Sequence, residues 1–244
     1  MNSPVINRVA EWQWHALDDD LVIGRGDASP RPDGRLFLSI DTWHDEVFDQ
    51  LAAAMLAVLP RPLYTVVDEA DLQLRTRWTQ AGLTARRREW EYVLAVGDDR
   101  AVPTPGLSLL APGSAELDPL RDLDRAIRAE IEDTIGWDHM PAAVLSRPLD
   151  PANYFVAAES GEYVGLARLA LLPRLTRVGL LAVRRDHRRR GIGRALLAGI
   201  VAATHERGVG MVTAEVHEAN TAAIALFEAA GAARPSSNLE LVIR

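Results

Sequence analysis

The sequence contains neither cysteine nor lysine among its 244 residues. The absence of cysteine excludes disulfides, thiolate metal ligands, iron–sulfur clusters and a cysteine nucleophile. The absence of lysine excludes a Schiff-base mechanism and the lysine of a phosphate-binding P-loop. All 27 basic residues are therefore arginine. Together these two absences remove several large enzyme classes.

Long apolar runs are also absent. No stretch approaches the roughly 18 uninterrupted apolar residues of a membrane span, and the first twenty residues have no long apolar core. We therefore expect a cytoplasmic protein without a membrane partner. The net charge of −7 argues against nucleic acid as a partner. Metal binding is not expected either, because no metal-ligand spacing relates the six histidines, at positions 15, 44, 139, 187, 205 and 217.

The composition is that of an ordinary globular protein, with 48% hydrophobic and 25% charged residues. The length allows one large domain or two small ones. Prolines and glycines crowd residues 99–119, a density typical of a connector. The sequence therefore predicts a domain over 1–98, a linker over 99–119 and a second domain over 120–244.

Hydrophobic periodicity predicts alternating strands and helices in both parts. In the first part we expect strands over 36–40, 63–67 and 86–94, a helix opened by a Thr42–Asp45 capping box, and a helix over 71–81. In the second part we expect helices from 119 to 136 and over 192–207 and 221–230. A hairpin over 154–158 and 163–171 and strands over 178–183, 211–216 and 239–243 complete it.

The two parts echo each other at an offset of 149 residues. Residues 78–82 then align with 227–231, and the helix beginning near Trp43 falls on the one beginning at Ile192. Little sequence identity accompanies the match. It indicates either two related halves or a chance agreement between two strand–helix–strand runs.

A run of arginines leads directly into the helix at Ile192. The first backbone N–H groups of a helix have no internal acceptor and carry partial positive charge, so a strand, a glycine turn and a helix N-terminus form an anion cradle. Gly191 and Gly193 allow close approach of a pyrophosphate. A basic run alone is more typical of a solvated or nucleic-acid-facing surface, but the glycine turn and the helix favour a coenzyme diphosphate loop.

At these residues the sequence resembles the GCN5-related N-acetyltransferase (GNAT) family. Its coenzyme A motif, Arg/Gln-x-x-Gly-x-Gly/Ala after a strand, matches residues 188–193, and its next block is similar to 215–231. Residues 215–220 also resemble the branch that acetylates the N-terminal alanine of a ribosomal protein. The resemblance implies an α+β protein made of two GNAT-like halves, each a twisted, mixed, largely antiparallel sheet flanked by helices.

The resemblance also implies acetyl-CoA as cosubstrate and assigns residues to it. The pantetheine arm would bind the main chain of Leu181, Ala182 and Val183. The pyrophosphate would bind, mostly through backbone N–H groups, to Arg188, Arg189, Arg190, Gly191, Ile192, Gly193 and Arg194. Asn220 would contact the coenzyme, and it is equally well placed to cap the helix that follows.

Direct transfer needs a base for the ammonium and a proton for the thiolate. The resemblance makes Glu215 the base, although an exposed strand-end carboxylate is an alternative interpretation. Family members commonly carry tyrosine where this chain has Phe227, which has no proton to give. Tyr92, Tyr154 and Tyr163 are candidate substitutes, unless water serves or no acid is needed.

The first half has Thr42, His44 and Val66 where the second has Gly191, Gly193 and Glu215. We interpret it as a degenerate half that cannot bind coenzyme and completes the substrate pocket. Trp137 and Asp138 could line an amine pocket, although Trp137 is more typical of a core. The resulting hypothesis is an acetyl-CoA-dependent N-acetyltransferase acting on a primary amine of a small molecule or peptide N-terminus. Alternatives are a non-catalytic acyl-CoA sensor and a nucleic-acid module. The sequence defines neither the acceptor nor the oligomeric state.

Overall fold

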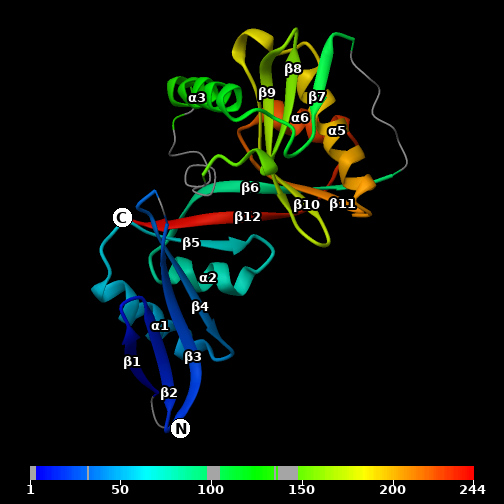
Figure 1. Ribbon diagram of the computed structural model, residues 1–244. Coiled ribbons are helices and arrows are strands. Elements are labelled where there is room, and N and C mark those ends of the chain that lie inside the picture. The colour runs from blue at the N-terminus through cyan, green and yellow to red at the C-terminus, as the bar shows by residue number, and fades with distance from the viewer. Residues whose placement is uncertain (1–3, 32, 98–104, 135, 137–147) are drawn as a thin grey trace. The chain divides into compact units, whose positions relative to one another are not determined.

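The computed structural model describes residues 4–31, 33–97, 105–134, 136 and 148–244. The chain forms two compact units, one of Met1–Glu89 with Ser236–Arg244 and one of Trp90–Pro235. It passes from one unit to the other within strand β6 (Thr84–Ala95) and again within strand β12 (Ala233–Ile243). Figure 1 labels the helices and strands.

The first unit is a mixed sheet with two helices. Strands β1 (Val5–Ala10), β2 (Gln13–Asp18), β3 (Leu21–Pro30) and β4 (Leu36–Thr42) pair antiparallel in chain order. Strand β5 (Leu63–Asp68) pairs parallel with β4 and antiparallel with the end of β12. Helix α1 (Asp45–Val58) connects β4 to β5, as a parallel pair requires, and α2 (Leu72–Gln80) follows β5.

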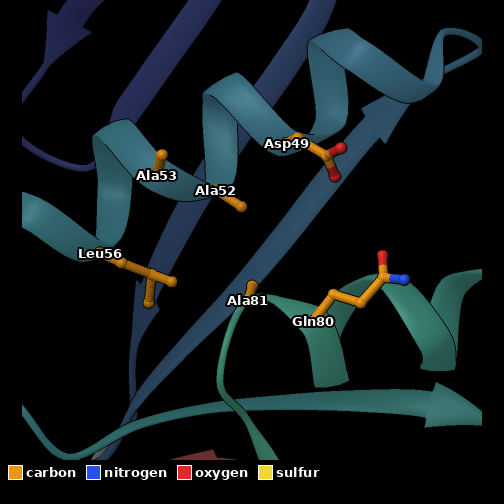
Figure 2. Close-up of a pocket in the computed structure, with 6 residues that line it drawn as sticks. All are labelled: Asp49, Ala52, Ala53, Leu56, Gln80 and Ala81. Atoms are coloured by element: carbon orange, nitrogen blue, oxygen red, sulfur yellow. The ribbon is translucent and has the colours of Figure 1, made fainter.

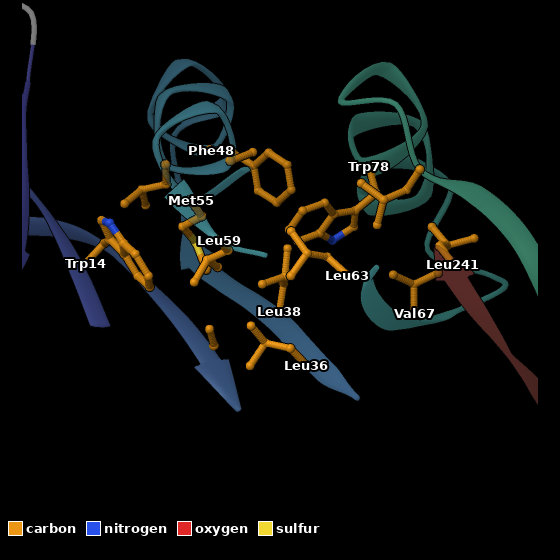
Figure 3. Close-up of a cluster of buried hydrophobic side chains, with 14 of the residues drawn as sticks. Trp14, Leu36, Leu38, Phe48, Met55, Leu59, Leu63, Val67, Trp78 and Leu241 are labelled. Atoms are coloured by element: carbon orange, nitrogen blue, oxygen red, sulfur yellow. The ribbon is translucent and has the colours of Figure 1, made fainter. Parts of the chain in front are cut away.

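The core of this unit lies between the two helices and the sheet (Figure 3). Helical spacing puts Val47, Leu51 and Met55 on the buried side of α1. Two glycines of β3 face them: a Cβ on Gly24 would lie 2.7 Å from Val47 Cγ1, and one on Gly26 would lie 2.5 Å from Met55 Sδ. Only glycine therefore lets α1 approach the strand this closely.

The second unit has the strand order β6-β11-β10-β9-β8-β7. Strands β7 (Leu107–Leu110), β8 (Tyr154–Glu159), β9 (Glu162–Leu171) and β10 (Thr176–Val183) pair antiparallel, and β10 pairs parallel with β11 (Met211–His217). The helices are α3 (Leu117–Thr134), α5 (Ile192–Glu206) and α6 (Thr221–Ala229). Helix α5 connects the parallel pair.

Both faces of this sheet are covered. Leu120, Leu123 and Ile127 of α3 pack against Val156 and Leu166. The next residues along these strands point the other way, so Ala157 and Ala167 pack in the cluster formed by α5 and α6. We refer to the two sides as the α3 face and the α5 face.

The predicted fold class is confirmed, as is the tandem arrangement. The 149-residue offset places α2 on α6, β5 on β11 and β6 on β12. Even the helix caps correspond: Asp71 accepts a hydrogen bond from the Leu74 N–H, and Asn220 accepts one from the Ala223 N–H. Gly82 and Gly231 both follow the helix with positive φ, at 97° and 79°. The agreement is too detailed for two unrelated runs.

Several local predictions were incomplete or wrong. Strands β1, β2 and β3 were not predicted, and most or alternate residues of each are exposed. Strand β7 was not predicted either, and it lies inside the predicted linker. The Thr42–Asp45 capping box does not form, because Thr42 ends β4 and α1 begins at Asp45 with His44 as its N-cap. The domain bounds 1–98 and 120–244 stay a prediction. The compact units divide the chain differently, because Ser236–Arg244 belongs to the first unit, where β12 pairs with β5.

Candidate active site

Strands β10 and β11 diverge in the middle of the second unit. Along one edge β10 pairs with β9 as far as Val183↔Gly165, with a register shift between Val178 and Leu180. Along the other edge its register with β11 runs only from Thr176↔Val212 to Val178↔Ala214. Beyond Val178, Leu181, Ala182 and Val183 therefore have β9 on one side and no paired strand on the β11 side, within the described residues. A bound chain can use such an opened edge.

The segment after β10 forms an open turn in front of α5. A 3₁₀ turn over Arg185–His187 is followed by two residues with positive φ, Arg189 at 62° and Gly191 at 81°. Gly191 is the N-cap of α5 and provides no side-chain cap. The first helical bond runs from the Ala195 N–H to the Gly191 carbonyl oxygen. The N–H groups of Ile192, Gly193 and Arg194 precede it and are the donors that helix starts leave for a ligand.

The turn is open at Gly191. A Cβ built on Gly191 would meet no atom within 4 Å. A larger residue there would be strained, since L-residues rarely adopt this φ. The turn and the helix dipole fit a phosphate group.

Three of the arginines fasten the turn to the rest of the unit. Arg184 pairs with Glu162 of β9 and with Asp186. Arg190 pairs with Glu159 of β8 at 2.5 Å. Because their charges are paired with carboxylates, the positive potential of the arginine-rich segment before α5 is smaller than its composition suggests.

Arg188 is the third fastening residue, and it reaches α3. Its guanidinium donates to Glu130 at 2.8 Å and to the Val183 carbonyl oxygen at 2.9 Å. Glu130 also accepts from the Arg185 N–H, with both carboxylate oxygens at 3.0 Å. Glu130 thus holds the turn at two points. Within the described residues, Arg185, Arg189 and Arg194 have exposed side chains that take part in no ion pair.

Glu215 lies on β11, one residue beyond the last pair with β10. Val212, Ala214 and Val216 pack on the α5 face, so alternation puts Glu215 on the α3 face. Its carboxylate forms an ion pair with Arg177 of β10, with 2.6 Å between Nη2 and Oε2. The Glu215 side chain is 32% exposed and the Arg177 side chain is 47% exposed.

The residue at the common tyrosine position has no access to the exterior. Phe227 is 3% exposed and stacks on Tyr92, with ring centroids 5.5 Å apart. Burial, and then the charge of Glu228, raise the pKa of the Tyr92 phenol. Burial, and then Asp124, likewise raise the pKa of Tyr154. The hydroxyl of Tyr163 accepts a hydrogen bond from the Glu116 N–H. The role of these three phenols as a substitute acid stays a prediction.

The remaining predicted residues fall in two groups. Asn220 caps α6 by accepting from the Ala223 N–H at 3.1 Å, so its capping role is confirmed. Its coenzyme contact stays a prediction. Trp137 and Asp138 lie outside the described residues. Glu130 and Arg177 were missed, because their partners lie 58 and 38 positions away in the sequence and no local pattern points to them.

The first unit lacks an equivalent turn. Only Trp43 and His44 separate β4 from α1, whereas residues 184–191 separate β10 from α5. The first unit instead has a cavity of about 340 Å³ between α1 and α2 (Figure 2). Alanines and Leu56 line it together with Asp49 and Gln80. No anion-binding turn adjoins this cavity.

No helix in the described part of the chain is long and apolar enough to cross a membrane. No group of three or more histidine, aspartate or glutamate side chains in the described ranges is arranged to hold a metal ion.

Comparison with known proteins places these features in context. Residues 120–232 match the Acetyltransferase (GNAT) family. A segment of 51 residues is 45% identical to the [Ribosomal protein bS18]-alanine N-acetyltransferase of Escherichia coli K12, covering 21% of this chain and 34% of that protein. The chain thus spans about a third of the length of the curated relatives it matches.

Solved structures resemble nearly the whole chain. A GCN5-related N-acetyltransferase from Sphaerobacter thermophilus superposes with a TM-score of 0.69 at 19% identity, covering 97% of this chain and 82% of that one. A tandem GNAT protein from the clavulanic acid biosynthesis pathway gives 0.66 at 15% identity, over 99% and 83%. At these identities the likeness concerns the fold.

Proposed function

Because the C-terminal half of this chain, over residues 120–232, belongs to the GNAT family of acetyltransferases, which use acetyl-CoA as cosubstrate, we propose that the protein acetylates a primary amine. The acceptor is a small molecule or a peptide N-terminus. One observation carries the proposal: the open, glycine-capped turn at the start of α5 directly follows a strand whose edge is freed by its divergence from β11.

The residues of this region fit the coenzyme. The freed main chain of Leu181, Ala182 and Val183 would hold the pantetheine arm. The pyrophosphate would lie on the backbone N–H groups between Arg188 and Arg194. Arg189 and Arg194, whose side chains take part in no ion pair within the described residues, add positive charge there. When bound, the coenzyme supplies the thioester acetyl group.

The transfer breaks a C–S bond and forms a C–N bond. The acceptor arrives as an ammonium and loses one proton to Glu215, which passes it to solvent. The amine nitrogen then attacks the acetyl carbonyl carbon. Collapse of the tetrahedral adduct releases the thiolate, and the nitrogen loses its second proton in the same step. The thiolate takes up a proton, so the products are an amide, a thiol and one released proton.

Phe227 cannot protonate the thiolate, and this departure is compatible with turnover. A thiol has a pKa of about 8.5, so its thiolate is a far better leaving group than an alkoxide or an amide. Protonation by water therefore suffices, and a dedicated acid contributes little. The tyrosine of other members can be absent without loss of the reaction.

A calorimetric titration with acetyl-CoA tests the coenzyme site. Gly191→Glu puts a carboxylate on the phosphate turn and should abolish binding. Gly208→Glu is the matched control, because Gly208 lies at the other end of α5, also has positive φ and also has no atom within 4 Å of its Cβ position. Binding that persists in Gly191→Glu would remove the turn from the site. Turnover is then measured as acceptor-dependent thiol release.

A binding protein that senses acyl-CoA without turnover is the second candidate, favoured by the buried, proton-free Phe227. It predicts one coenzyme per chain and no thiol release with any amine. Phe227→Tyr separates the two functions. Under the acetyltransferase proposal this variant changes kcat less than threefold, whereas thiol release that appears only in Phe227→Tyr supports the sensor.

A further inference from the structure

The ion pair between Arg177 and Glu215 spans the point where the register between β10 and β11 ends. Arg177 is the Cα partner of Thr213, and Glu215 is the first residue of β11 on this face beyond the last pair, Val178↔Ala214. Both side chains extend from the α3 face, opposite the cluster formed by α5 and α6. An acceptor that reaches the freed edge of β10 from the α3 face passes this pair.

The pair is poorly suited to a base that works alone. One oxygen of Glu215 is already engaged with the guanidinium at 2.6 Å. An ammonium that approaches Glu215 therefore competes with the guanidinium for this carboxylate. Both oxygens of Glu215 become available when something else occupies Arg177.

The pair is also easily opened. Both side chains are long and roughly a third to a half exposed, and exposed ion pairs of this kind contribute little to stability. A ligand with one positive and one negative group can exchange partners with both ends. Each charge then keeps an opposite neighbour, whereas a ligand with only an amine leaves Arg177 without a counter-charge.

We propose that the acceptor carries a carboxylate close to its primary amine, as free amino acids do. The acceptor carboxylate binds Arg177 and draws it from Glu215, and the acceptor ammonium binds the freed Glu215. Glu215 then takes the first proton, and the transfer proceeds as described above to an N-acetylamino acid and free thiol. Arg177 thus determines specificity and positions the acceptor. This inference rests on the acetyltransferase function proposed above.

The inference is tested with pairs of amines that differ only in whether they carry a carboxylate. Two suitable pairs are 4-aminobutyrate with butylamine and alanine with alaninamide. The quantity compared is kcat/KM for thiol release, corrected for the fraction of each amine that is present as the ammonium. The parent should prefer the acid-bearing member of each pair by about tenfold or more.

Substitutions at position 177 identify the group responsible. Arg177→Gln should reduce the preference to near unity, chiefly through KM for the acid-bearing amines. Arg177→Glu should shift the preference to a diamine such as 1,4-diaminobutane. Arg174→Gln is the matched control, because it removes an exposed arginine three residues away and should leave the preference unchanged.

The possible results separate the two proposals. If Arg177→Gln keeps the preference, or the parent favours amines without an acid, Arg177 does not select the acceptor, while the acetyltransferase function stands. If acetyl-CoA binds and no amine in the panel releases thiol, both proposals fail together. If Arg177→Gln abolishes the preference for acid-bearing amines and Arg174→Gln does not, both proposals are supported.

Discussion

Glu130 of α3 and Arg188 of the turn before α5 form an ion pair with 2.8 Å between Oε2 and Nη2, and the same carboxylate accepts the Arg185 N–H. The shape of this turn therefore depends on the packing of α3 on the sheet. Helix α3 packs through an independent set of apolar residues, including Leu123 and Ile127. Glu130 can thus be altered without opening the core.

Glu130→Gln should weaken acetyl-CoA binding about tenfold, or ~1.4 kcal/mol. The amide carries no charge for Arg188, and the geometry of the turn relaxes. Calorimetry measures the dissociation constant, and thermal unfolding should change little. Glu132→Gln, at an exposed position of the same helix, is the control. Equal affinities of the two variants would show that Glu130 does not position the turn.

Glu215→Gln should lower kcat by about a hundredfold or more, the usual contribution of a general base. The dependence of kcat/KM on pH should also change in the variant, because the group that accepts the first proton is missing. Coenzyme affinity should stay within twofold, because Glu215 pairs with Arg177 of β10 and not with a residue of the turn. Steady-state kinetics across pH tests this. An unchanged pH profile would exclude Glu215 as the base.

The equivalent caps Asp71 and Asn220 allow a paired comparison. Each accepts a hydrogen bond from the N–H three residues on, so Asp71→Ala and Asn220→Ala should each lower the free energy of unfolding by about 1 kcal/mol. If Asn220 also contacts the coenzyme, only Asn220→Ala weakens acetyl-CoA binding beyond twofold. Denaturant unfolding and calorimetry provide the two measurements. Equal coenzyme affinity in both variants would leave Asn220 as a cap only.

Glu69 should make the first unit sensitive to acid. Hydrogen bonds from Arg88 and Ser237 lower the pKa of its carboxyl below the ordinary 4.5, and they outweigh the opposing effect of burial. A lowered carboxyl pKa stabilises the fold above the unfolded value, and this stability is lost as pH falls through the folded value. Glu69→Gln should therefore cost about 1–2 kcal/mol at pH 7.

Near the acid end of this pH range, Glu69→Gln and the parent should have the same free energy of unfolding. The side chain at position 69 is neutral in both proteins there. Denaturant unfolding measured between pH 7 and pH 3 tests this convergence. A difference that stays constant over this range would mean that the contribution of Glu69 does not depend on its charge.

Much of the fold was predictable where local signals agree. Helix α5 combines an apolar stripe with Gly191 before it and Gly208 after it, so its bounds were predicted within one residue. Strand β1 gave no such signal, because its apolar residues do not alternate with polar ones and five of its six residues are exposed. Strand β7 lies among prolines and glycines, where composition indicates a connector although pairing with β8 makes a strand.

The sequence by itself determined the features that depend on neighbours in the chain. These include the two-part pattern at a 149-residue offset and the glycine turn that opens α5. Tertiary structure alone decided the partners of the charges. The pairs Arg188–Glu130 and Arg177–Glu215, and the pairing of β12 with β5, join residues far apart in sequence. An ion pair depends on distance in space, which only the packing of helices and strands fixes.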